Sequence, residues 1–172
     1  MLRWSLVPPW ADSPKLPYAT FNARVESVAE KATYRDPWKR GQRCLIPASV
    51  FYEWEKTPSR PGGRKQCYAL RMKDGGGFAF GGLWADWRDR AAEREGADAP
   101  PLGTCTILTT APNAVLAAFH DRSPVIVPPE HHAAWLDPVT PLDALAPLLE
   151  PYPAEAMTAT PIDAPRGTRR PD

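Results

Sequence analysis

The chain has 172 residues, a hydrophobic content of 43% and seven Trp residues, which together indicate one folded domain and exclude a disordered chain. Its 22 Pro residues favour many short elements with extended connections and argue against a helical bundle. The formal net charge of +1 excludes a generic polycation, so binding to nucleic acid would require a local basic groove.

The first ten residues predict a half-buried strand. Leu2, Trp4 and Leu6 are apolar and the residues between them are polar, which is the period of two expected when one face of a strand is buried. The alternation is present from the first residues, so we expect the chain to begin in mid-strand, as though partner strands should precede it. A Pro-rich connection over residues 11–19 follows.

A short helix is predicted from Ser27 to about Thr33, because Ser27 and Glu30 have the spacing of a capping box. Asn22 and Arg24 lie on the segment that enters this helix, and strand alternation places both side chains on one face. Both are candidates for a polar site. The alternative interpretation is a turn residue and a solvated charge.

The next segment, residues 34–43, is basic and contains Trp38. Basic side chains interleaved with an aromatic ring are typical of a groove that follows a nucleic acid backbone and offers a stacking platform. A solvated surface is the alternative. The four basic residues are Arg35, Lys39, Arg40 and Arg43.

Residues 43–54 predict a strand that is interrupted near Pro47, because the residues on both sides are apolar or aromatic. The strand ends in Glu53, between Tyr52 and Trp54. A carboxyl group walled by two aromatic rings is poorly solvated, and this raises its pKa toward the range useful for proton transfer. An exposed Glu at the end of a strand is the alternative.

The rest of the chain predicts four strands and three short helices. The strands are expected over residues 65–72, 78–87, 104–110 and 123–127. The helices are expected over residues 114–119, 129–136 and 142–149, the last with Thr140 as its N-cap. We predict loops over 57–64 and 88–103 and a disordered tail over 163–172. The pattern indicates one α+β domain over residues 1–162, built on an antiparallel, barrel-like β-sheet with short flanking helices.

The number of cysteines and the hydropathy of the chain indicate its cellular environment. Cys44, Cys67 and Cys105 are odd in number and lack metal-ligand spacing, so we predict small buried side chains in a reducing compartment, without disulfide or metal. No apolar run approaches about 18 residues, and the N-terminus lacks a signal-peptide core. We expect a cytoplasmic monomer that requires no cofactor and no membrane.

His120 is the third candidate polar group, after Asn22 and Glu53. It follows a predicted helix and precedes Asp121 and Arg122, so a neighbour could orient it, and imidazole titrates near neutrality. A lone His is usually structural. Paired with a semi-buried Glu it could serve acid–base chemistry, although spacing alone does not bring the two together.

Six sequence blocks, in order, resemble those of the SOS response-associated peptidase (SRAP) family, whose members act on abasic sites in single-stranded DNA. The resemblance covers roughly residues 3–138 and implies an SRAP-like fold. It also implies that the partner is single-stranded DNA containing abasic sites. The blocks are Phe21–Glu26, Arg43–Ala48, Phe51–Trp54, Phe80–Trp84, Ile107–Asn113 and His120–Ile126.

The resemblance implies a chemistry and a role for each matching residue. An N-terminal Cys would condense with the aldehyde of the abasic site and form a thiazolidine crosslink, and the same Cys underlies a proposed peptidase activity. Asn22 would position the N-terminal group, Glu53 would move protons, and His120 would assist ring opening, crosslink reversal or strand cleavage. For the DNA, the resemblance implies phosphate contacts by Arg24, Arg35 and Arg122, base stacking by Trp10 and Trp54, and a path lined by Thr109.

The sequence departs from the family at its beginning. The opening Met-Cys-Gly-Arg block is not present, and residue 2 is Leu. We expect either a start upstream of Met1 that supplies the Cys, or a truncated member that forms no crosslink. The alternative function is a non-catalytic single-stranded DNA-binding module. A hydrolase of ordinary peptides acting through Glu53 and His120 is a third hypothesis, for which no nucleophile or metal set is visible.

Overall fold

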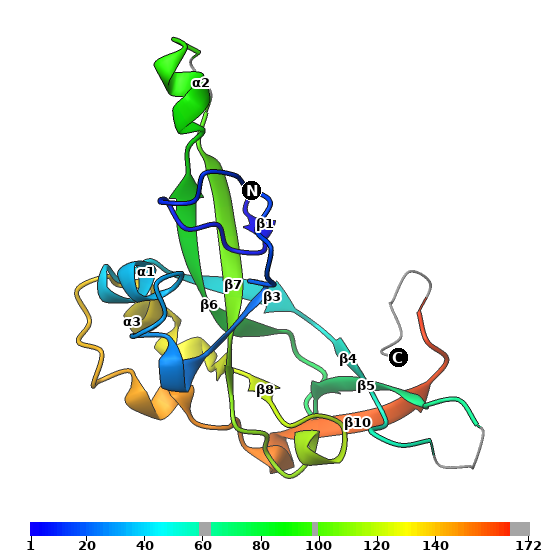
Figure 1. Ribbon diagram of the computed structural model, residues 1–172. Coiled ribbons are helices and arrows are strands. Elements are labelled where there is room, and N and C mark those ends of the chain that lie inside the picture. The colour runs from blue at the N-terminus through cyan, green and yellow to red at the C-terminus, as the bar shows by residue number, and fades with distance from the viewer. Residues whose placement is uncertain (59–62, 98–99, 166–172) are drawn as a thin grey trace.

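The computed structural model describes residues 1–58, 63–97 and 100–165, and within them ten strands form two sheets (Figure 1). The larger sheet has the order β1-β7-β6-β3, with β2 and β8 also on β7 and β9 on β6, and the smaller has the order β10-β5-β4. The strands are β1 Arg3–Trp4, β2 Asn22–Arg24, β3 Arg43–Ala48, β4 Phe51–Trp54, β5 Cys67–Met72, β6 Phe78–Trp87, β7 Leu102–Thr110, β8 Ser123–Pro124, β9 Ile126–Val127 and β10 Met157–Ile162.

The predicted α+β class and barrel-like sheet are confirmed. All strand pairs are antiparallel except β1 with β7 and β2 with β7, which are parallel. The chain crosses from the larger to the smaller sheet between β3 and β4, just after Pro47, where the sequence predicted an interruption. Because Pro cannot donate to a ladder, it is suited to an edge strand such as β3.

The helices of the described residues are short. Three are α-helices, α1 Arg35–Lys39, α2 Arg90–Arg94 and α3 His132–Leu136. Five are 3₁₀ helices, η1 Val25–Ser27, η2 Leu116–Ala118, η3 Pro129–His131, η4 Ala146–Leu149 and η5 Ala154–Ala156. Helix α2 stands at the tip of the arm formed by β6 and β7 (Figure 1). The sequence predicted a loop there, but Asp89 caps this helix by accepting the N–H groups of Ala91 and Ala92.

The predicted N-terminal strand is much shorter than expected, and its alternation does not correspond to burial. Leu2 and Trp4 are exposed, at 41% and 56%, whereas Leu6 is fully buried. The extended conformation ends at Ser5, which has a φ of 111°, an uncommon value for a residue with a side chain. The Ser5 hydroxyl lies 2.9 Å from that of Thr20, which holds the turn in place.

The predicted capping-box helix is wrong. Residues 25–27 form η1, and consecutive turns then lead to α1. The carbonyl of Lys31 accepts the N–H groups of both Tyr34 and Arg35, while Val28 is 1% exposed in the core. Burial of Val28 therefore sets the path of this segment, because a helix of seven residues has little stability of its own.

Two other predicted helices form only in part. Residues 114–119 contain η2 alone, and residues 142–149 contain η4 alone. Thr140 does not cap a helix, because its hydroxyl donates to the carboxylate of Asp137. Strand β10 was missed, since Pro161 demotes a strand prediction, yet all six of its residues lie in register with β5. Residues 166–172 of the predicted disordered tail lie outside the described residues.

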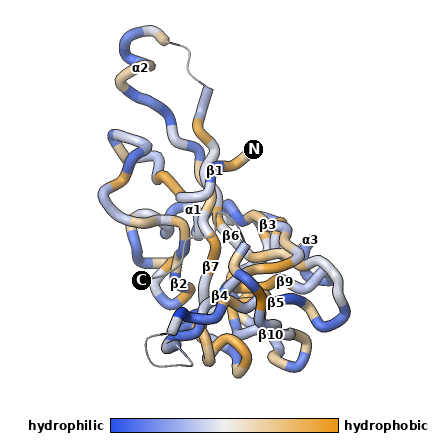
Figure 2. The backbone as a smooth tube through the Cα atoms, turned by 90° about the vertical axis from the view of Figure 1, so that its right-hand side faces the viewer, coloured by the Kyte–Doolittle hydropathy of each residue, from blue (hydrophilic) through white to orange (hydrophobic). Residues whose placement is uncertain are grey.

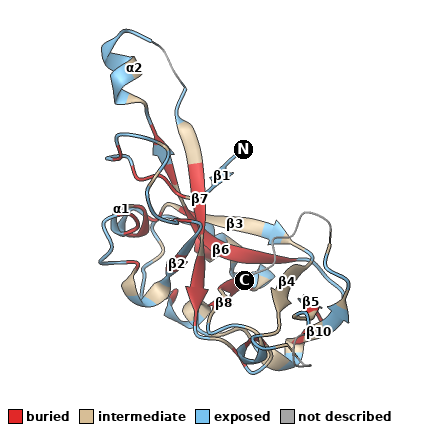
Figure 3. Cartoon of the chain, turned by 45° about the vertical axis from the view of Figure 1, so that its right-hand side comes forward, coloured by how far each residue is buried: buried red, intermediate tan, exposed pale blue. Residues whose placement is uncertain are grey.

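The core is centred on β6 and β7, two long strands in which most residues are buried (Figure 3). One cluster packs Trp38 and Trp135 against Leu83 and Leu108 of these strands. The second fills the space toward the smaller sheet and includes Leu70, Phe80, Leu116 and Ile126. Figure 2 shows that the tip around α2, away from these clusters, is mainly hydrophilic.

The basic segment over residues 34–43 is partly structural rather than a stacking platform. Trp38 is 6% exposed and belongs to the core. Arg43 is 3% exposed, and its guanidinium donates to the main-chain oxygens of Trp135 and Asp137. Burial lowers the pKa of Arg43, and these carbonyl partners compensate for its desolvation.

Replacing Gly82 with Ala is expected to lower the free energy of unfolding by about 1–3 kcal/mol, the usual cost of overpacking. A Cβ at Gly82 would lie 2.5 Å from the carbonyl oxygen of Thr106 and 2.6 Å from the Ile46 side chain, so the strands would have to separate. Gly77→Ala is the control, because its Cβ would approach only the oxygen of Ala48, at 3.5 Å. Urea denaturation measures the stability of both variants, and equal midpoints would contradict the close approach of the neighbouring strands at Gly82.

Candidate functional site

A cavity of about 200 Å³ opens where β2, β4 and β7 come together with the loop that precedes β8. It brings together five of the nine site residues predicted from the sequence, namely Asn22, Glu53, Thr109, His120 and Arg122. Apolar side chains form much of the remaining wall. They are Trp4, Phe51, Phe80, Ile107 and Pro124, and Ser123 completes the lining.

Strand β4 places Glu53 in this cavity by simple alternation. Phe51 and Glu53 both line it, whereas Tyr52 and Trp54 do not, as expected because successive side chains of a strand point to opposite faces. The sequence interpretation had Glu53 walled by Tyr52 and Trp54, and this is wrong. The apolar side chains that share the cavity with Glu53 come from its own face of β4 and from β1, β6, β7 and β8.

Burial raises the pKa of the Glu53 carboxyl, and the positive charge that His120 can carry opposes this shift only in part. The direction is the one predicted from the sequence, although other residues cause the desolvation. A carboxyl group with a raised pKa can hold its proton closer to neutral pH and pass it on. Glu53 in turn contributes, after burial, to raising the pKa of the Cys67 thiol.

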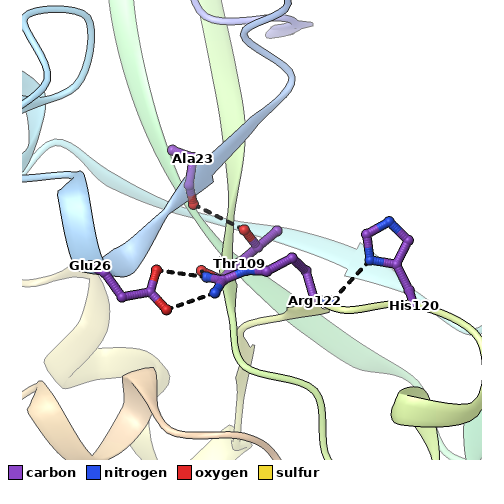
Figure 4. A network of polar contacts seen from close by, with 5 residues as sticks. All are labelled: Ala23, Glu26, Thr109, His120 and Arg122. Atoms are coloured by element: carbon purple, nitrogen blue, oxygen red, sulfur yellow. Dashed lines mark hydrogen bonds and ion pairs between the residues drawn. The ribbon is translucent and has the colours of Figure 1, made fainter.

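The loop before β8 carries His120 and Arg122 (Figure 4). The backbone N–H of Arg122 donates to Nδ1 of His120 at 2.9 Å. The guanidinium of Arg122 donates to both carboxylate oxygens of Glu26, at 2.7 and 2.8 Å, and to the main-chain oxygen of Thr109. The contact with Glu26 was not predicted from the sequence, because it joins residues 96 positions apart.

Strand β2 supplies Asn22. Asn22 and Arg24 are exposed on one face while Ala23 is buried, which is the alternation predicted from the sequence. Parallel pairing of β2 with β7 sets Asn22 beside Ile107, and Thr109 ties the two strands further by donating its hydroxyl to the oxygen of Ala23. Asn22 therefore reaches the cavity, whereas Arg24 is not part of its lining.

Three further predicted residues lie outside the cavity. Trp10 is 47% exposed and its indole N–H donates to the oxygen of Ala32. Arg35 opens α1 and pairs with Asp36 at 3.4 Å. Trp54 lines a separate cavity of about 300 Å³. That cavity also contains two basic side chains, those of Arg64 and Lys65.

Trp4 is the main lining residue that the sequence did not assign to the site. Its ring packs edge-on against Phe21, with centroids 5.9 Å apart and an interplanar angle of 72°, and its indole N–H donates to the Phe21 oxygen at 2.7 Å. These contacts hold the ring at the cavity while leaving it 56% exposed. Its place beside Asn22 depends on both β1 and β2 pairing with β7, and no local pattern signals this.

The described residues contain no group of three or more His, Cys, Asp or Glu side chains that could hold a metal ion. In the same residues, no helix is both long and apolar enough to cross a membrane. The three cysteines are free, with Cys67 and Cys105 buried and Cys44 partly so. Burial raises the pKa of the Cys44 thiol to about 12, and none of the three lines the cavity of Glu53.

Comparison with known proteins gives consistent matches. The family model described as SOS response associated peptidase (SRAP) matches residues 1–165. The abasic site processing protein YoqW of Bacillus subtilis is 41% identical over 159 residues, which are 92% of this chain and 66% of that protein. The abasic site processing protein HMCES of Gallus gallus is 30% identical over 154 residues, covering 79% of this chain and 44% of that protein.

Solved structures agree with this fold. A crystal structure of a protein from Bacteroides thetaiotaomicron superposes with a TM-score of 0.79 at 27% identity, covering 94% of this chain and 68% of that one. A protein from Bordetella bronchiseptica gives the same TM-score at 26% identity, covering 95% and 76%. The chain thus spans about two thirds of the length of these relatives, and less than half of HMCES.

Proposed function

The chain belongs to the SRAP family, and from this membership we propose that its cavity receives an abasic site in single-stranded DNA. The observation that carries the proposal is the convergence of Asn22, Glu53 and His120 on one cavity. Relatives named as abasic site processing proteins support the choice of substrate. The size of the cavity, about 200 Å³, is below the range of about 300–1,000 Å³ that holds drug-sized ligands, and it suits a single sugar better than a nucleotide.

The polar groups suit the opening of an abasic sugar. The closed sugar must gain a proton on its ring oxygen and lose one from its hydroxyl before the aldehyde is exposed. Glu53, whose pKa burial raises, would carry one of these protons, and His120 would assist as hydrogen-bond donor or acid–base partner. Asn22, which offers both a donor and an acceptor, would orient the group that attacks the aldehyde.

In the family mechanism that group is an N-terminal Cys, whereas residue 2 of this sequence is Leu. We propose that a Cys with a free α-amine reacts in this cavity beside Asn22. Its α-amine would add to the aldehyde and release water to form an imine. The thiol would then add across the C=N bond and close a thiazolidine ring. The same acid and base would serve the reverse reaction, strand cleavage and self-processing by the peptidase activity.

The DNA strand would approach over exposed aromatic and basic side chains. Trp4 offers an exposed ring at the cavity, and Arg24 presents its charge on the same strand face as Asn22. Trp54, with Arg64 and Lys65 in its own cavity, would extend the path to the next nucleotides. Base stacking and phosphate neutralisation together are the usual means of binding single strands.

Binding to an oligonucleotide with one abasic site is expected to be about tenfold tighter than to the intact strand, the factor equivalent to one added hydrogen bond. Fluorescence anisotropy at several salt concentrations measures both affinities. Arg24→Ala should reduce the salt slope by about 0.7, the value for one phosphate contact on a single strand. Arg71→Ala, which removes an exposed charge on β5, should leave the slope unchanged.

A denaturing gel separates the two candidate functions. A shifted band that survives denaturation and depends on the abasic site would support the crosslinking enzyme. Salt-sensitive binding with equal affinity for abasic and intact strands would refute the abasic-site proposal and leave the non-catalytic single-stranded DNA-binding module. If Arg71→Ala, and not Arg24→Ala, reduced the salt dependence of the affinity, the DNA would bind near β5 and not beside β2.

A further inference from the structure

A carboxylate outside the cavity holds one of the residues that line it. Glu26, on η1, accepts from both terminal nitrogens of Arg122 at 2.7 and 2.8 Å (Figure 4). One of these nitrogens also donates to the main-chain oxygen of Thr109 on β7. The side chain of Arg122 is 20% exposed and that of Glu26 is 55% exposed. Together they bridge three segments that are distant in the sequence.

The guanidinium of Arg122 needs this carboxylate. Its Nε is buried and has no hydrogen-bond partner, and a buried cation costs free energy unless it is paired. Within the described residues, Glu26 is the acidic group to which Arg122 donates. The hydrogen bond from Arg122 lowers the pKa of Glu26, so the pair is ionised at neutral pH. With its charge matched and two nitrogens engaged, Arg122 is better suited to fix the loop than to hold a phosphate.

The backbone of Arg122 transmits this restraint to His120. The peptide N–H of Arg122 donates to Nδ1 of His120 at 2.9 Å, so Nδ1 must be the acceptor nitrogen of the neutral ring. The proton of the neutral ring then sits on Nε2, the other nitrogen of the imidazole (Figure 4). His120 thus offers a hydrogen-bond donor at Nε2 as long as the loop from 120 to 122 keeps this conformation.

We infer that Glu26 is a positioning residue for His120: by clamping the guanidinium of Arg122 against β7, it keeps the Arg122 peptide N–H on Nδ1 and thereby fixes Nε2 as the donor of the cavity. The effect of His120 on abasic DNA rests on the proposed function, whereas the restraint of Arg122 and His120 by Glu26 does not. In that reaction the Nε2–H would donate to an oxygen of the opened sugar, while Glu53 exchanges the second proton.

Glu26→Ala tests the clamp, and Glu30→Ala is the matched control. Glu30 is an exposed carboxylate four residues further on, and it is not among the hydrogen-bond partners of Arg122. NMR hydrogen exchange on the whole chain should show the Arg122 amide exchanging about tenfold faster in Glu26→Ala, since hydrogen bonds to charged groups are the strong ones. The ring nitrogen shifts of His120 should change with it. In Glu30→Ala both signals should remain as in the wild type.

The exchange of the Trp84 amide, which donates to the oxygen of Gln42, reports on the core. It should accelerate much less than that of Arg122 in Glu26→Ala, because loss of the pair frees the 120–122 loop locally, whereas Trp84 exchanges only when the sheet opens more widely. Faster exchange at Trp84 and Arg122 by the same factor would show a merely structural role and overturn the inference. Unchanged exchange at Arg122 would overturn it as well.

A second measurement separates the inference from the proposed function. Glu26→Ala should lose most of the expected preference for the abasic over the intact strand, with the affinity for the intact strand kept. If the wild type shows no such preference, the proposed function fails, and the NMR comparison still decides the clamp. If the preference exists and Glu26→Ala retains it in full, the positioning role is refuted while the proposed function stands.

Discussion

Replacing Trp135 with Ala is expected to lower the free energy of unfolding by about 3–5 kcal/mol, the usual cost of truncating a buried large aromatic side chain. Trp135 is fully buried, and its indole N–H donates to the oxygen of Cys44 at 3.0 Å. Its own carbonyl accepts from the buried guanidinium of Arg43. The substitution therefore opens a cavity next to a buried charge. Urea denaturation at neutral pH measures the loss.

Leu136→Ala is the matched control for this prediction. Leu136 is the next residue on α3 and is 47% exposed, so its truncation should cost well under 1 kcal/mol, as is usual for surface positions. Similar losses for the two variants would mean that α3 as a whole, and not the buried indole, stabilises the sheet.

Replacing Glu53 with Gln is expected to stabilise the fold and to impair the proposed reaction. Burial raises the pKa of Glu53 above its ordinary value of 4.5, so the folded protein binds this proton more tightly than the unfolded chain does. The wild type therefore loses stability as the pH rises through the pKa that Glu53 has in the folded protein. Below the pKa that Glu53 has in the unfolded chain, this loss is absent. Gln does not ionise. At pH 8 the variant should gain about 2–4 °C in Tm, the shift that 1 kcal/mol gives in a domain of this size.

Two further measurements accompany this substitution. The Tm difference should shrink toward zero as the pH falls below about 4, and Glu150→Gln, which neutralises an exposed carboxylate, should show no such trend. In protein that carries the N-terminal Cys of the family mechanism, reaction with abasic single strands should slow by about 10²–10⁴, the usual contribution of general acid–base catalysis. A Tm difference that is constant with pH would contradict the burial of an ionisable Glu53.

The sequence predicts an element well where residues within that element determine its conformation, and poorly where contacts with distant residues do. Strands β5, β6 and β7 follow from runs rich in apolar, aromatic or β-branched residues, and they lie within a few residues of their predicted bounds. Of the predicted helices, residues 129–136 alone are helical throughout, as η3 followed by α3. The pair Ser27 and Glu30 has the spacing of a capping box, yet burial of Val28 decides the path of that segment.

The site shows the same limit. Alternation along β4 places Glu53 and Trp54 on opposite sides, as their separate cavities show. The sequence interpretation that walled Glu53 with Tyr52 and Trp54 overlooked this. The resemblance to a family named nine site residues, and five of them line the cavity of Glu53. Contacts between distant segments had no such signal, because the pair of Glu26 with Arg122 and the position of Trp4 arise only when β1, β2 and the loop before β8 meet on β7.

The parallel pairing of β1 and β2 with β7 has a consequence for the order of folding. Arg3 lies beside Thr104 and Asn22 beside Ile107, so both strands must wait for a partner that is synthesised much later. Closing such long loops costs chain entropy, which makes pairings of high contact order slow to form. The antiparallel β6–β7 hairpin can form first as a local unit. The cavity of Glu53 is then completed in a late stage, after most of the chain has been synthesised.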